Sequence, residues 1–139
     1  MTPLEIMEKL SATWYPDAMG QAATALSWTE VFAPDIVLTE PSSLPHGGTH
    51  HGLEAFLAVQ AGMAGHWEQR IEEADYWPCA PDRVCLRIAI TWTARATARA
   101  VTLPMIDLIR FSSGGPDARI SAIEAFVSDT AALLATLEP

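Results

Sequence analysis

Apolar and polar positions follow a helical spacing in the first half of the chain and alternate in the second half. The first apolar helix face follows Thr2-Pro3, a pair typical of helix starts, and consists of Leu4, Met7, Leu10 and Trp14. The same spacing predicts a helix over 21–32, ended by the turn-like segment 33–35, and a helix over 52–64. A short apolar run at 36–40 between them predicts a strand.

The period changes to two at residue 67. Runs rich in valine, isoleucine, threonine and aromatic residues predict four strands, at 67–78, 83–95, 99–111 and 119–128, and a short helix follows them. Proline, glycine and aspartate mark two of the turns, and the third lies within the sequence "TARATARA". Consecutive strands joined by short turns predict a mainly antiparallel sheet with helices on one face. The chain is therefore expected to be one α+β domain over residues 1–139.

The composition of the chain argues against some classes of function. The 139 residues carry 8 basic and 17 acidic side chains, a formal charge of −9, and half of them are hydrophobic. Because phosphate backbones require a positive surface, nucleic-acid binding is not expected. No apolar run is long enough to span a membrane, and the acidic N-terminus is unlike a signal peptide. We expect a soluble, cytoplasmic protein with no membrane partner.

An acid stands in an apolar row of the strand at 99–111. Alternation places five side chains on one face: Leu103, Met105, Asp107, Ile109 and Phe111. An ionised carboxylate there is costly unless it is paired, hydrogen-bonded or protonated, so Asp107 alone is most simply a satisfied structural group. The opposite face is also largely apolar, which predicts a homodimer through the outer face of the sheet.

A second acid, Glu40, ends the strand at 36–40 and precedes a loop rich in proline, glycine and histidine. Alone it is consistent with a turn cap or a surface ion pair. Together, two carboxyl groups can abstract a proton next to a carbonyl and donate a hydrogen bond to the oxygen, provided that their pKa values differ. We expect a raised pKa for Asp107 in its apolar row and a pKa nearer the ordinary value for Glu40.

Three histidines, His46, His50 and His51, lie within six residues of this loop. Their spacing is not that of a zinc site and no cysteine is near, so no metal is expected. His46 is either a solvent-facing loop residue or a residue at the mouth of a ligand pocket.

Three stretches together resemble a known superfamily: "FAPDIVLTEP", "HGGTHHGLEAFLAV" and "MIDLIRFSSGGPDARISAIEAFVSD". They are similar to the nuclear-transport-factor-2-like superfamily, and within it to the SnoaL-like polyketide cyclases and the ketosteroid isomerases. The resemblance implies a cystatin-like α+β barrel, in which a cone-shaped, curved, mainly antiparallel sheet wraps around N-terminal helices. It also implies a deep apolar pocket between the sheet and the helices.

The resemblance also implies roles for single residues. Glu40 corresponds to the isomerase base, and Asp107 to the strand acid that stays protonated and donates a hydrogen bond to the substrate oxygen. The tyrosine of the isomerase oxyanion site has no direct match, since Pro16 takes its place and Tyr15 is one step away. The expected ligand-binding residues are Trp14, Tyr15, His46, Phe56, Gln60, Met105 and Ile123.

These observations predict a protein that binds a small, largely apolar organic molecule. We expect cofactor-free acid–base chemistry next to a carbonyl, of isomerase, cyclase or dehydratase type. A non-catalytic ligand-binding or accessory protein of the same fold is the alternative. An epoxide hydrolase ranks third, because Arg110 alternates away from Asp107 and no second strand acid lines up with it.

Overall fold

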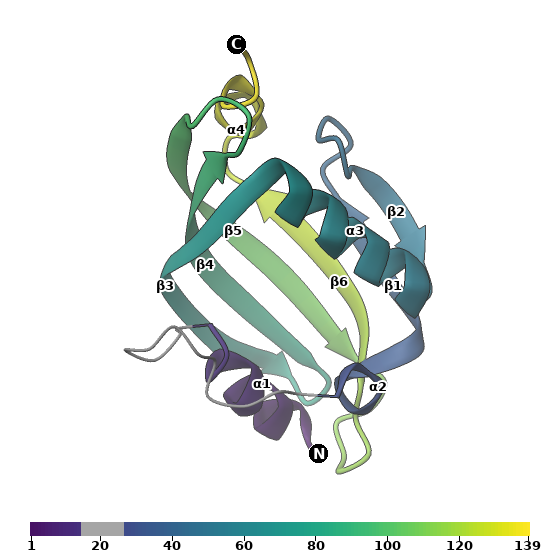
Figure 1. The fold of residues 1–139 in the computed structure, drawn as a ribbon. Coiled ribbons are helices and arrows are strands. Elements are labelled where there is room, and N and C mark those ends of the chain that lie inside the picture. Colours follow the sequence, from purple (N-terminus) through teal and green to yellow (C-terminus); the bar gives the residue numbers. More distant parts are fainter. Residues whose placement is uncertain (15–26) are drawn as a thin grey trace.

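A computed structural model describes residues 1–14 and 27–139 of the chain (Figure 1). Six strands form one curved, unclosed sheet in the order β2-β1-β6-β5-β4-β3, and α3 crosses its concave face. This arrangement confirms the predicted α+β class. The elements in chain order are α1 (Pro3–Ser11), α2 (Trp28–Val31), β1 (Phe32–Glu40), β2 (Gly48–His51), α3 (Leu53–His66), β3 (Trp67–Ala80), β4 (Arg83–Ala94), β5 (Ala100–Phe111), β6 (Ile120–Val127) and α4 (Thr130–Ala135).

The sheet is mainly antiparallel, as the sequence predicts. Strands β3 to β6 pair consecutively and antiparallel, joined by short connections, and β1 pairs antiparallel with β2. The exception is the pair of β1 and β6, which is parallel. Strand β6 therefore joins the two halves of the chain, since it lies between β1 from the first half and β5 from the second (Figure 1).

Helix α1 begins as predicted, and its buried face overlaps the predicted one at Met7 but excludes Leu4. Thr2 and Glu5 form a capping box, in which each side chain accepts a hydrogen bond from the other residue's backbone N–H. Leu4, assigned to the buried face by its spacing, is 49% exposed, whereas Ile6 and Met7 are fully buried. The buried side of the helix is therefore rotated by part of a turn from the predicted side. Apolar spacing alone does not fix how a helix is rotated about its own axis.

The helix predicted over 21–32 is wrong at its end. Helix α2 covers only Trp28–Val31, and the earlier part of the prediction lies largely outside the described residues. Phe32 is extended and begins β1, with its ring centroid 4.8 Å from that of Phe56 on α3. Packing against α3 thus overrides the helical spacing at Phe32.

Strand β1 is longer than predicted and contains the segment 33–35, which was expected to be a turn. Pairing with β6 is irregular between Phe32 and Val37, and β2 pairs only from Val37 onward. Pro34 lies in this interrupted part, so its missing N–H removes no ladder hydrogen bond.

The loop after Glu40 is shorter than the sequence suggests, because Gly48–His51 forms strand β2. Two turns reverse the chain: Leu44 N–H donates to Pro41 O and Gly47 N–H donates to Leu44 O. The loop lies against the protein, with Leu44 buried. The backbones of Pro41 and Gly47 therefore approach each other closely.

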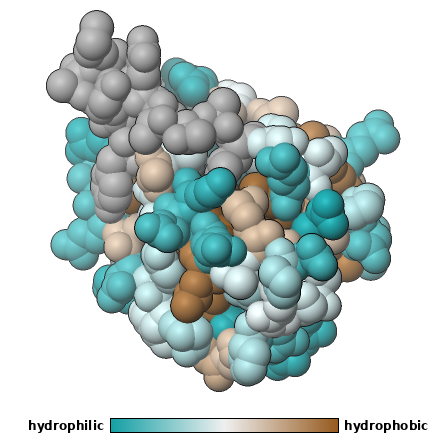
Figure 2. Space-filling view, turned by 90° about the horizontal axis from the view of Figure 1, so that it is seen from below, coloured by the Kyte–Doolittle hydropathy of each residue, from teal (hydrophilic) through white to brown (hydrophobic). Residues whose placement is uncertain are grey.

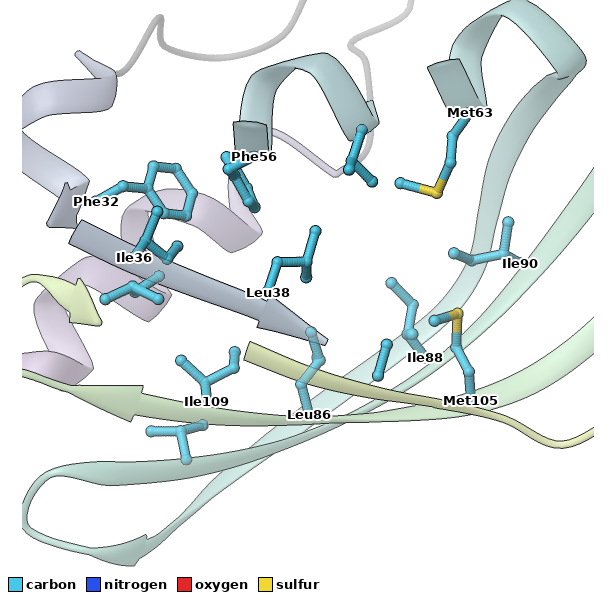
Figure 3. Packing of buried hydrophobic residues seen from close by; sticks show 14 of the residues in the cluster. Phe32, Ile36, Leu38, Phe56, Met63, Leu86, Ile88, Ile90, Met105 and Ile109 are labelled. Atoms are coloured by element: carbon cyan, nitrogen blue, oxygen red, sulfur yellow. The ribbon is translucent and has the colours of Figure 1, made fainter. Parts of the chain in front are cut away.

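The core lies between α3 and the concave face of the sheet (Figure 3). On α3 the buried side chains are Phe56, Val59 and Met63. The alternation predicted for β5 is confirmed: the four apolar residues of the inner row are buried, and Asp107 among them is half-buried. The described helices include none that is long and apolar enough to cross a membrane.

The outer face of the sheet is partly apolar. Leu108 on β5 and Phe126 on β6 are 45% and 48% exposed, close to the charged side chains of Arg110 and Glu124. A homodimer through this face remains a prediction.

Replacing Gly47 should disrupt the loop that follows Glu40. A Cβ atom at Gly47 would lie 2.3 Å from Pro41 O and 2.8 Å from backbone atoms of Ser42. Since backbone cannot move aside cheaply, Gly47→Ala should lower the free energy of unfolding by about 1–3 kcal/mol, as overpacking does. The control Gly62→Ala adds the same methyl on α3 where no atom lies within 4 Å, and it should be neutral or stabilising. Urea unfolding checks both variants, and equal effects would contradict this account of the loop.

Candidate functional site

A cavity of about 370 Å³ lies between the helices and the concave face of the sheet. Its wall is mostly apolar and aromatic, with side chains from α1, α2, α3 and all strands except β2. Figure 2 views the molecule from the side of α1 and α2, where apolar side chains lie among hydrophilic ones near the centre of the face. A volume of this size suits a small organic molecule.

The strand register brings the two predicted acids to one level of this cavity. Thr39 of β1 pairs with Glu124 of β6, and Asp107 of β5 pairs with Ala125 of β6. Glu40, one residue beyond Thr39, therefore lies across β6 from Asp107, with backbones two strand spacings or about 10 Å apart. Both acids line the cavity, and the small, buried residue Ala125 lies between them in the register.

Burial makes both carboxyl groups weak acids. Glu40 is 8% exposed, and desolvation followed by repulsion from Asp107 raises its pKa to about 8. Desolvation raises the pKa of Asp107 to about 7. Among the described residues that line the cavity there is no lysine or arginine to offset these charges. The raised pKa predicted for Asp107 is confirmed, but the ordinary pKa predicted for Glu40 is wrong, since the folded chain buries Glu40 beside the other acid.

His46 is buried rather than exposed to solvent. Its Nε2 lies 3.8 Å from Glu40 Oε2, too far for a hydrogen bond, and it lines the same cavity. Desolvation, with smaller contributions from His50 and His66, lowers the pKa of His46 to about 4, so the imidazole is neutral at pH 7. A ring nitrogen of His50 donates to the His46 carbonyl at 2.9 Å and helps to hold the loop.

Unpaired polar atoms collect at this cavity. The buried side-chain atoms without a hydrogen-bond partner in the described parts of the chain are Nδ1 and Nε2 of His46, Nε1 of Trp92 and Oδ1 of Asp107. All three side chains line the cavity. Buried polar groups are normally paired, so these atoms indicate a place where polar atoms of a ligand would be bound.

The structure brings most of the predicted ligand-binding residues to the cavity. The side chains that line it are those of Trp14, His46, Phe56, Gln60, Met105 and Ile123. Tyr15 lies outside the described residues. Arg110 lies in the groove on the outer face, so it is not beside Asp107.

Sequence reasoning missed Trp92 and Trp28, which also line the cavity. Trp92 follows Leu86 and Ile90 in the inward row of β4, so strand alternation could have placed it. Trp28 lies in a short helix whose packing the pattern did not predict. Among the described residues, no group of three or more histidine, cysteine or acidic side chains could hold a metal ion.

The two carboxyl groups, Glu40 and Asp107, are suited to transfer a proton to and from a ligand. Since both carboxyl pKa values lie near neutrality, the pair of Glu40 and Asp107 holds about one proton at pH 7 to 8. One carboxyl can then accept a proton from a ligand while the other donates a hydrogen bond.

Comparison with known proteins identifies the fold. A protein with an NTF2-like fold from Burkholderia thailandensis E264 is 22% identical, with a TM-score of 0.76 over 100% of this chain and 99% of that chain. An NTF2-like protein of unknown function from Burkholderia pseudomallei K96243 is 26% identical, with a TM-score of 0.67 over 78% and 81% of the two chains. A protein with a ketosteroid isomerase-like fold from Catenulispora acidiphila DSM 44928 is 20% identical, with a TM-score of 0.64 over 100% and 96%.

Comparison of the sequence with family profiles identifies the family. No curated protein matches the chain significantly. The profile of the SnoaL-like domain, however, matches residues 13–133, which include every element that contributes to the cavity except α1. The chain therefore belongs to the SnoaL-like domain family, with an NTF2-like fold.

Proposed function

We propose that the cavity binds a small, largely apolar carbonyl compound and that Glu40 and Asp107 move a proton at the carbon next to its carbonyl, without a cofactor. The observation that carries this proposal is the pair of carboxyl groups in the cavity, whose pKa values rise to about 8 and about 7 while none of the described lining residues is a lysine or arginine. Structural carboxylates are normally paired with cations or hydrogen-bond donors. An unpaired acid pair in a cavity is typical of catalytic sites.

In the proposed reaction the singly protonated pair is the active state. Asp107 holds the proton and donates a hydrogen bond to the carbonyl oxygen, while ionised Glu40 removes a proton from the adjacent carbon. The electrons of the broken C–H bond move into the enolate, whose oxygen gains negative charge beside Asp107. Glu40 then returns the proton to a carbon of the ligand, so that no other reactant is consumed.

A carbonyl oxygen bound at Asp107 would produce this division of roles. Without ligand, the higher pKa of Glu40 favours the proton on that residue. Oδ1 of Asp107 has no hydrogen-bond partner among the described residues, so a carbonyl oxygen placed there would stabilise protonated Asp107. The proton would then pass to Asp107 and leave Glu40 as the base, beside the neutral imidazole of His46.

Family membership supports the reaction class, since SnoaL-like proteins include cofactor-free cyclases and isomerases. One observation favours a second candidate, a ligand-binding protein without turnover. The described residues that line the cavity include no tyrosine that could supply the second oxyanion donor of the ketosteroid isomerases. The experiment below separates the two candidates.

The direct test is hydrogen–deuterium exchange at the carbon next to the carbonyl of small aromatic ketones, followed by NMR in heavy water. The wild-type protein should accelerate exchange. Glu40→Gln should lower the rate by at least about a hundredfold because it removes the base. Asp107→Asn should lower it less, by about tenfold to a hundredfold, because an amide still donates a hydrogen bond.

Unfolding curves should accompany the assay, so that loss of structure is recognised. Exchange that persists in both variants would contradict the proposal, and complete loss only in Asp107→Asn would reverse the two roles. Ligand binding without exchange in the wild-type protein would favour the second candidate.

Stability should fall as the pH rises from 6.5 to 8. The pKa of Glu40 is about 8 in the folded protein, and its reference value, which we take for the unfolded chain, is 4.5. Folding is therefore accompanied by uptake of a proton between pH 4.5 and pH 8. The stabilisation is complete below pH 4.5 and is lost as the pH rises through 8. His46, whose pKa is lowered from 6.5 to about 4, acts oppositely but only below pH 6.5.

Urea unfolding between pH 6.5 and 8 measures this dependence. Each proton bound on folding contributes a slope of about 1.4 kcal/mol per pH unit, and Glu40→Gln should remove about one such proton. Glu124→Gln, which removes an exposed carboxyl from β6, is the control for loss of charge. An identical slope in the wild-type protein and Glu40→Gln would show that Glu40 ionises normally.

A further inference from the structure

Trp92 is a buried donor that the acid–base reaction does not use. Its side chain is 2% exposed and lines the cavity, and its indole Nε1 has no hydrogen-bond partner among the described residues. An unpaired buried N–H is costly, and indole can only donate. The missing partner is therefore an acceptor, and the cavity is the open space beside the ring.

The neighbouring Trp67 is a second buried tryptophan, and its indole N–H does have a hydrogen-bond partner. Trp67 is fully buried, and its Nε1 donates to Thr136 Oγ1 at 2.8 Å. The two indole rings meet edge to face with centroids 5.5 Å apart. Among the described residues, one of these two adjacent indoles thus has a partner for its N–H, and the one that lines the cavity has none.

His46 also lines the cavity, and it shares an aromatic neighbour with Trp92. Its ring meets Trp67 edge to face at 6.0 Å, so His46 and Trp92 both contact one aromatic ring. Both imidazole nitrogens of His46 lack a partner among the described residues. A neutral imidazole offers one donor and one acceptor, which together suit a hydroxyl group.

We propose that Trp92 N–H is a second anchoring point that donates to an oxygen of the ligand, beside His46 and apart from the carbonyl oxygen at Asp107. The substrate is then a carbonyl compound that carries a further hydroxyl or carbonyl group. This inference rests on the proposed function for the identity of the first oxygen. Trp92 acts here as a positioning and specificity residue, since it takes no part in proton transfer.

Calorimetric binding of α-tetralone and its ring-hydroxylated derivatives tests the proposal. These small bicyclic ketones differ only by a second oxygen. The wild-type protein should bind at least one hydroxylated derivative about tenfold more tightly than α-tetralone, the scale of one hydrogen bond. Trp92→Phe keeps an aromatic side chain but removes the N–H together with part of the indole, and it should abolish this preference, measured as the ratio of the two affinities.

Trp67→Phe is the matched control because it makes the same chemical change at an indole whose N–H is already paired. It should lower the melting temperature and keep the preference. Trp92→Phe also removes part of a buried side chain, so its melting temperature should fall as well, and the loss of the preference is what distinguishes it from Trp67→Phe.

No preference in the wild-type protein, or a preference that survives Trp92→Phe, would overturn the inference. The latter result is expected if only a bound water satisfies Trp92. Calorimetry measures binding without turnover, and it can be repeated in Glu40→Gln. The binding result is therefore independent of the exchange assay. A preference without exchange would contradict the proposed function alone, and exchange without a preference would contradict this inference alone.

Discussion

Two carboxyl groups share an apolar cavity in which none of the described lining residues is a lysine or arginine. The surroundings solvate an ionised carboxylate poorly, so desolvation raises the pKa of Glu40 to about 8 and that of Asp107 to about 7, and repulsion from Asp107 adds to the shift of Glu40. The neutral state of His46 has the same cause, because its burial opposes protonation. Desolvation thus sets the protonation of all three groups near neutral pH.

The fold maintains this desolvation through a few contacts. The parallel pairing of β1 with β6 carries Glu40 to the level of Asp107, with Ala125 of β6 between them in the register. The close approach of Gly47 to Pro41 belongs to the loop that places the buried His46 3.8 Å from Glu40. Helix α3 covers the concave face (Figure 1). The acids therefore depend on long-range contacts rather than on their sequence neighbours.

This dependence explains what could be predicted from the sequence. Alternation over 101–111 was sufficient to place Asp107 in a buried row, because that pattern is local. The pKa of Glu40 could not be predicted, since it depends on a second acid brought near by β6. The burial of His46 and the unpaired N–H of Trp92 likewise depend on packing. The end of α2 at Val31 was missed because Phe32 packs on Phe56 instead of continuing the helix.

The central claim is that the two acids share about one proton at neutral pH, and a carboxyl-carbon NMR titration tests it most directly. The signals of Glu40 and Asp107 would be assigned with Glu40→Gln and Asp107→Asn and followed from pH 3 to pH 10. The account predicts that the pair titrates with apparent pKa values of about 7 and about 8. Titration of both carboxyl groups at about pH 4, as in exposed acids, would contradict it.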